Sequence, residues 1–89
     1  MASDELIASW QRTQRHLRDA LARQKLPEDV RATTLDLIAH NEYGVAFEYL
    51  VNVLAESDAE LTEPARRVLA SAALEMGLDD NPDWLALST

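Results

Sequence analysis

The segment from Glu42 to Glu56 has apolar side chains at helical spacing, and this pattern limits the fold more than any other feature of the chain. Successive residues of an α-helix are turned by about 100°, so one side of this segment is apolar and the other is polar. The apolar side, which we expect to face a core, consists of Tyr43, Ala46, Phe47, Leu50, Val53 and Leu54. The opposite side carries Val45, Glu48, Tyr49, Asn52 and Glu56.

Helix start and stop signals divide the rest of the chain, and no run alternates for long enough to form a strand. Ser3 and Thr62 are suited to cap helices, and Pro27 suits a first helical turn. Asn41 and Gly77 are placed to end helices. We predict helices over about residues 4–25, 27–40, 42–56 and 63–76, followed by a short turn over 82–87. The predicted fold class is all-α, a compact bundle of four helices plus a short C-terminal helical turn, with residues 1–89 as a single domain.

Three further apolar clusters are expected to join the core. The stripe of the first helix consists of Leu6, Ile7, Trp10, Leu17 and Leu21, and it is interrupted by Thr13 and Gln14. The stripe of the fourth helix permits close helix approach and consists of Ala65, Leu69, Ala72, Ala73 and Met76. In the tail, we expect the bundle to be covered by Trp84, Leu85 and Leu87. Gly44 costs a helix roughly 0.5–1 kcal/mol, so we expect a neighbouring helix to approach its backbone closely.

The charge of the chain is negative and unevenly distributed. Residues 1–26 contain five basic and three acidic side chains, a balance of +2, and residues 27–89 contain three basic and thirteen acidic ones, a balance of −10, which together give the net charge of −8. The acidic part would repel nucleic acid and anionic membranes. It would attract a basic protein and accelerate its association. The alternative interpretation is that the acidity only keeps a small protein soluble.

The first residues and the cysteine content favour a cytoplasmic location. Met-Ala-Ser-Asp-Glu has no basic n-region, and no continuous apolar region or small-residue cleavage site follows it. No run approaches the roughly 18 apolar residues that cross a bilayer. Without Cys, the sequence has no disulfide framework and no Cys-based zinc site, which suits a reducing compartment.

The sequence offers few groups for catalysis or metal binding. His16 and His40 belong to no His-x-x-x-His or Glu-x-x-His pattern, so they do not indicate a metal centre. The start of a calcium loop is matched by Asp79, Asn81 and Asp83. Trp84 stands where that loop needs glycine, and no closing Glu follows. The carboxylates are interpreted as solvated acids, and we expect no enzymatic activity, no cofactor and no metal.

The second half of the chain contains residues in an uncommon order and spacing. They are Asn41-Glu42-Tyr43-Gly44, Ala46, Glu48, Leu50, Leu54, Leu61, Met76-Gly77-Leu78 and Trp84-Leu85. In these residues the chain resembles the MafI-type immunity proteins of bacterial polymorphic toxin and contact-dependent inhibition systems. The resemblance implies a small, mostly helical cytoplasmic protein without enzymatic activity or cofactor, which neutralises one tightly bound toxin domain. It supplies no contact residues, because immunity surfaces differ with the toxin that each one blocks.

The polar side of the 42–56 helix is the predicted partner-binding surface. A tyrosine at the edge of a charged patch is typical of surfaces that bind another protein. We expect Tyr49 to be the buried anchor and the carboxylates to pair with Lys or Arg of the toxin. The predicted contact residues are Asp36, Glu48, Tyr49, Asn52, Glu56, Asp58 and Glu60. The competing interpretation is that Tyr49 and Val45 pack on a neighbouring helix or a chain end.

Two other kinds of binding protein fit the same residues. One is an acidic helical adaptor that sequesters a basic cellular protein, and the other is a DNA-mimic inhibitor of nucleases or DNA-binding proteins. Mimicry requires acids spaced regularly across most of one face, whereas here they cluster in 27–40, 42–56 and the following loop. We expect a basic toxin that acts on nucleic acid or nucleotides, and no direct binding of nucleic acid or membrane by this chain. Its oligomeric state is open between a monomer and a weak dimer, the dimer using Trp10 or Trp84 if either is exposed.

Overall fold

The computed structural model describes residues 3–57 and 60–88, and these are all-α, as predicted. The helices are α1 (Asp4–Arg23), α2 (Glu28–Ala39), α3 (Tyr43–Glu56), α4 (Glu63–Met76) and α5 (Pro82–Ser88). The boundaries of every helix lie within two residues of the predicted ones. No strand occurs in the described residues.

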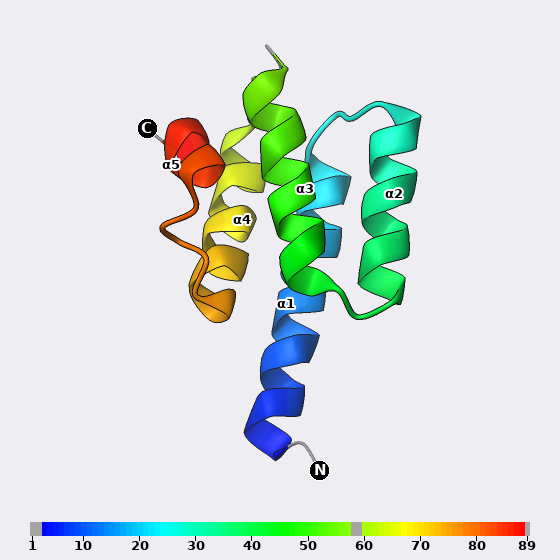
Figure 1. Cartoon of the computed structure of the whole chain (residues 1–89), viewed down its shortest axis with the longest axis vertical. Coiled ribbons are helices and arrows are strands. Elements are labelled where there is room, and N and C mark those ends of the chain that lie inside the picture. The colour runs from blue at the N-terminus through cyan, green and yellow to red at the C-terminus, as the bar shows by residue number, and fades with distance from the viewer. Residues whose placement is uncertain (1–2, 58–59, 89) are drawn as a thin grey trace.

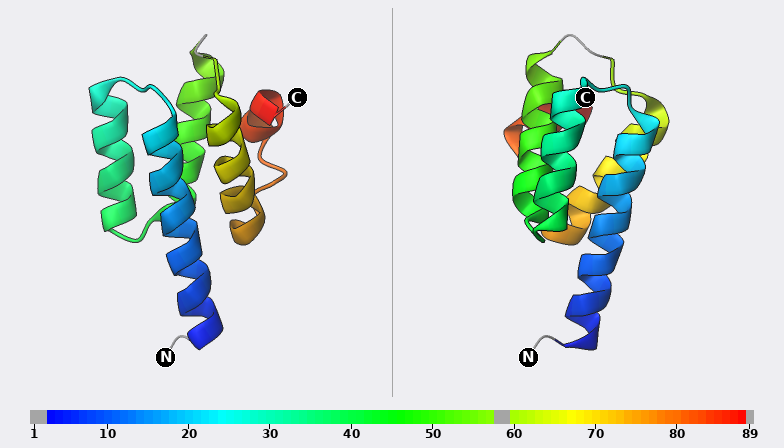
Figure 2. Two further views of the ribbon diagram at one scale, coloured as in Figure 1. Left: turned by 180° about the vertical axis from the view of Figure 1, so that it is seen from behind. Right: turned by 90° about the vertical axis from the view of Figure 1, so that its right-hand side faces the viewer.

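The helices form a bundle in which α3 lies between α2 and α5, with α1 and α4 behind it (Figure 1). The main packed pairs are α1 with α4, α2 with α3, and α3 with α5. Figure 2 shows the bundle from behind, where α1 runs between α2 and α4. The core between these helices consists of Leu17, Ala20, Leu21, Val30, Ile38, Ala46, Phe47, Leu50, Val51, Leu54, Leu61, Ala65, Leu69, Ala72, Ala73 and Trp84.

The first turns of α1 extend beyond the ends of the other helices (Figures 1 and 2). α1 has 20 residues, or about 30 Å of helix, whereas α3 and α4 have 14 each, or about 21 Å. Leu6, Ile7 and Trp10 are consequently 44%, 41% and 45% exposed. The expectation that these three side chains join the core is wrong, because no other helix reaches far enough to cover them. Leu17 and Leu21 of the same stripe are buried.

Three helices begin at a polar side chain that caps the first amides. Ser3, Thr62 and Asn81 precede α1, α4 and α5, and each side-chain oxygen accepts a hydrogen bond from the N–H three positions later, at 3.1, 3.3 and 3.1 Å. The predicted caps Ser3 and Thr62 are thus confirmed. Asn81, which matched a calcium-loop position in the sequence, has a structural use as a cap.

Two helices end at a residue with positive φ. Asn41 after α2 has a φ of 60°, and Gly77 after α4 has a φ of 69°. The N–H of the following residue donates to a carbonyl five positions back, at 2.9 Å for Glu42 and 2.8 Å for Leu78. This arrangement gives partners to carbonyl groups that a helix end otherwise leaves open, so both predicted stops are confirmed.

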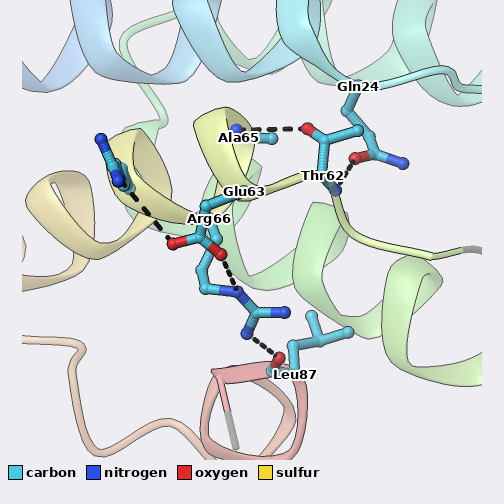
Figure 3. Close-up of polar contacts among 7 residues, drawn as sticks. Gln24, Thr62, Glu63, Ala65, Arg66 and Leu87 are labelled. Carbon is cyan, nitrogen blue, oxygen red and sulfur yellow. Dashed lines mark hydrogen bonds and ion pairs between the residues drawn. The ribbon is translucent and has the colours of Figure 1, made fainter.

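The buried amide of Gln24 joins the end of α1 to the segment before α4 (Figure 3). Gln24 Nε2 donates to the carbonyl of Glu60 at 3.1 Å, and Oε1 accepts from the N–H of Thr62 at 2.9 Å. The hydroxyl of Thr62 donates to the carbonyl of Arg23 at 2.9 Å. Arg31 of α2 also donates to carbonyls at the end of α1. Three segments are thus held together where α1 ends.

The short helix α5 is held by α3 on one side and by α4 on the other. Trp84 is buried, and its ring centroid lies 6.1 Å from that of Phe47. Arg66 of α4 donates to the carbonyl of Leu87 (Figure 3). The predicted packing of the tail is confirmed for Trp84 and for Leu87, which packs on the core. It is wrong for Leu85, which is 47% exposed because it lies on the solvent side of α5.

Gly44 and Gly77 should respond in opposite directions to alanine. A Cβ at Gly44 would meet Leu78 Cδ1 at 3.9 Å, an ordinary contact, so the expected close approach of a helix is wrong. Gly44→Ala should raise the free energy of unfolding by about 0.5–1 kcal/mol, because alanine loses less backbone entropy in a helix. Gly77→Ala should lower it by about 1–2 kcal/mol, because a Cβ is strained at a φ of 69°. Urea denaturation measures both, and a destabilised Gly44→Ala would contradict this account.

Removing the amide of Gln24 should destabilise the fold. Gln24→Ala leaves the N–H of Thr62 and the carbonyl of Glu60 without their partner, so the free energy of unfolding should fall by about 1–3 kcal/mol. Gln11→Ala is the control, because Gln11 is an exposed glutamine of α1, the helix that Gln24 directly follows. Thermal and urea denaturation of the two variants test the difference. Equal stabilities would show that the buried amide adds nothing.

Candidate functional site

The outer face of α3, formed by Val45, Glu48, Tyr49, Asn52 and Glu56, is the main candidate surface. Because the apolar side of α3 is buried, this face points away from the core, between α2 and α5 (Figure 1). Val45 is 51% exposed, and Glu48, Asn52 and Glu56 are also exposed. An apolar side chain therefore lies on the same accessible strip as two carboxylates and an amide.

Tyr49 serves the core as well as the surface. Its side chain is half-buried and packs against the core cluster. The ring therefore stabilises the domain in part, in line with the competing interpretation of this residue, and only the remainder is accessible. Val45 is the more exposed of the two apolar contacts on this face.

Asn52 is held in place by the C-terminal helix. Its Nδ2 donates to Asp83 Oδ2 of α5 at 3.2 Å. Asp83 thereby adjoins the outer face of α3, although the sequence pattern did not assign it there. The two residues are 31 positions apart, so no local spacing signals their contact.

Two of the remaining predicted contact residues, Asp36 and Glu60, lie outside α3. Asp36 is on α2, and its carboxylate is 3.6 Å from His40 Nδ1, with both side chains exposed. Glu60 follows the end of α3, and its side chain is exposed while its carbonyl accepts the hydrogen bond of Gln24. Asp58 lies outside the described residues. α3 therefore brings together four of the predicted contact residues and leaves out Asp36 and Glu60. The four are Glu48, Tyr49, Asn52 and Glu56.

A shallow groove of about 410 Å³ at the projecting end of α1 is a second candidate surface. We call it the α1 groove, and its apolar lining consists of Leu6, Trp10, Tyr43, Met76 and Leu78. Glu48 and Glu75 also line it, and Glu75 pairs with Arg12. Sequence reasoning missed this groove because it assigned Leu6 and Trp10 to the core. The interruption at Thr13 and Gln14 was the one local sign that α1 changes surroundings along its length.

The described residues show neither a metal cluster nor a membrane-spanning helix. Residues 3–57 and 60–88 contain no group of three or more His, Asp or Glu side chains arranged to hold a metal ion. None of the helices in these residues combines the length and the apolar character needed to cross a membrane. Comparison of the chain with protein-family models, with curated proteins and with solved structures found no match.

The pKa of His40 is raised above its ordinary value of 6.5, first by the hydrogen bond between Nδ1 and the carbonyl of Asp36 at 2.8 Å and then by the Asp36 carboxylate. Asp36→Asn should lower the pKa of His40 while the backbone hydrogen bond keeps part of the rise. Since folding raises this pKa, protonated His40 stabilises the folded protein. This contribution is complete below pH 6.5 and is lost as the pH rises through the pKa of His40 in the folded protein. NMR titration of the His40 ring in both proteins measures the change, with the His16 ring as an internal control. An unchanged His40 pKa in the variant would contradict the role of the carboxylate.

Proposed function

We propose that this protein binds and neutralises a toxin domain through the outer face of α3, as an immunity protein of the MafI type. The observation that carries the proposal is the 51% exposure of Val45 on a strip that also bears Glu48, Asn52 and Glu56. Protein-binding surfaces combine an apolar centre, which excludes water, with a polar rim. The resemblance of residues 41–85 to immunity proteins supports a toxin as the partner.

The charge of the chain favours a basic toxin. α3 carries two glutamates and no Lys or Arg, and residues 27–89 have a balance of −10. Such a field accelerates encounter with a basic surface and slows encounter with acidic ones. A toxin that acts on nucleic acid needs basic side chains in its cleft to bind the phosphates. An acidic face can cover such a cleft, or a surface beside it, without being a substrate.

Each residue of the outer face of α3 has a distinct role in this proposal. Val45 and the accessible part of Tyr49 form the apolar centre. Glu48 and Glu56 pair with Lys or Arg of the toxin. The hydrogen bond to Asp83 already fixes Asn52, which therefore loses little side-chain freedom on binding. Asp36 of α2 and Glu60 after α3 are exposed acids that would extend the acidic rim.

The first test is affinity capture of the partner by tagged protein from lysate of its native strain at moderate salt, followed by mass spectrometry. A single stoichiometric basic toxin domain is the expected result. Expression of that domain in a bacterial host should stop growth, and co-expression of this chain should restore it. Several basic housekeeping proteins that salt removes would contradict the proposal and favour an acidic adaptor.

Substitutions on the outer face of α3 should separate affinity from association rate. Val45→Arg should weaken toxin binding by about 2 kcal/mol, or roughly 30-fold, because it removes the apolar centre and adds a charge of the wrong sign. Glu48→Lys should mainly slow association and flatten its dependence on salt. Surface plasmon resonance with the captured toxin measures both quantities.

The matched controls for these variants lie away from the outer face of α3. Leu74→Arg changes a 69% exposed apolar residue of α4, and Asp80→Lys reverses an exposed acid after α4.

Tyr49→Ala should also weaken toxin binding by about 2 kcal/mol or more. Because the Tyr49 ring packs on the core, circular dichroism must show that this variant keeps its helices. Unchanged binding by Val45→Arg and Glu48→Lys would place the toxin on another surface.

A further inference from the structure

The side-chain amide of Asn52 has a fixed orientation on the outer face of α3. Its Nδ2 lies 3.2 Å from Asp83 Oδ2 of α5. An ionised carboxylate only accepts hydrogen bonds, so the amide atom that faces Asp83 must be Nδ2, which donates. Asn52 Oδ1 accepts no hydrogen bond from residues 3–57 and 60–88. The contact with Asp83 therefore leaves Oδ1 as the polar atom of Asn52 that a partner can use.

The position of Asp83 is determined by the packing of α5 beside α3 (Figure 1). Asp83 lies in the first turn of α5, which Asn81 caps. The next residue, Trp84, is 5% exposed and contacts Phe47 of α3. At the other end of α5, a backbone carbonyl accepts a hydrogen bond from Arg66 of α4. Because a helix of this length is unstable on its own, these contacts determine where the carboxylate of Asp83 lies.

We infer that Asp83 is a positioning residue of the toxin-binding face, because it holds the Asn52 amide so that only Oδ1 is available to the toxin. This inference rests on the proposed function. An amide that turns freely offers a partner either its donor or its acceptor. With Nδ2 bound to Asp83, Asn52 offers only an acceptor. A contact between two helices thus determines which groups of a toxin Asn52 can bind.

The fixed amide completes a row of acceptors on α3. Glu48, Asn52 and Glu56 are four residues apart, so they lie about one helical turn from each other on the same side of the helix. The two carboxylates and Asn52 Oδ1 all accept hydrogen bonds, and the row therefore matches N–H donors of Lys and Arg side chains. A carboxylate at position 52 would repel Glu48, Glu56 and Asp83, whereas an amide held by Asp83 supplies an acceptor without a charge.

Nuclear magnetic resonance of the isotope-labelled chain tests the position of the amide without a toxin. The Asn52 side-chain proton that faces Asp83 should resonate at lower field and exchange more slowly with water than that of a solvated amide. Asp83→Ala should remove both effects. Asp80→Ala is the matched control, because it removes an exposed acid after α4 and should leave both effects unchanged. Asn52 signals that do not respond to Asp83→Ala, in a chain whose α5 backbone signals are unchanged, would contradict the inference.

Binding of the captured toxin tests what the held amide contributes. Asp83→Ala should raise the dissociation constant roughly three- to tenfold, as expected for the loss of one hydrogen bond. Asp83→Asn should regain most of the affinity, because its Oδ1 can still accept a hydrogen bond from Asn52. Asn52→Ala should weaken binding by a similar factor, and Asp83→Ala should then add little, because Asp83 acts through Asn52. Asp80→Ala should bind as the unchanged chain does.

The outcomes distinguish this inference from the proposed function. Toxin binding that Val45→Arg weakens and Asp83→Ala does not would leave the face in place and rule out the positioning role. Additive losses from Asn52→Ala and Asp83→Ala would also rule it out, because Asp83 would then act independently of Asn52. A toxin that ignores Val45→Arg as well, or a chain that captures no toxin, would overturn the proposed face and this inference together, even if the Asn52 amide is held as expected.

Discussion

Close packing of α4 on α1 determines where the rest of the molecule lies. Ala65, Ala72 and Ala73 of α4 are fully buried, and their small side chains let the two helices approach closely. This contact involves the second half of α1, where Leu17 and Ala20 are buried. The first half has no such partner, because α4 is shorter than α1 and ends at Met76. One helix pair therefore produces both the core and the exposed segment beside it.

Features that depend on neighbouring residues were predictable from the sequence. Ser3, Thr62 and Gly77 act within one helical turn of their own position, so their effects follow from residue type and spacing. The apolar period of α3 likewise predicted which side is buried. Gln24 could not be assigned in this way, because its partners Glu60 and Thr62 lie 36 and 38 positions away.

Other features depend on relative helix length or on distant contacts, and the sequence pattern predicted these only in part. The apolar stripe of α1 runs from Leu6 to Leu21. Its pattern alone does not show which turns of α1 are packed against α4 and which are exposed. Gly44 suggested a close helix, but it faces the side chain of Leu78, which belongs to a distant turn. For the candidate site, the pattern predicted a polar outer face on α3 but not the share of the Tyr49 ring that the core uses. That share depends on how the neighbouring helices pack on α3, which the period of α3 alone does not determine.

Glu48 connects the two surfaces, because it belongs to the outer face of α3 and also lines the α1 groove. A ligand that entered the α1 groove would therefore meet a carboxylate that also belongs to the outer face of α3. If a partner of the outer face used the same carboxylate, the two ligands would compete for Glu48. Because binding linkage is reciprocal, each of them would then weaken the binding of the other by the same factor.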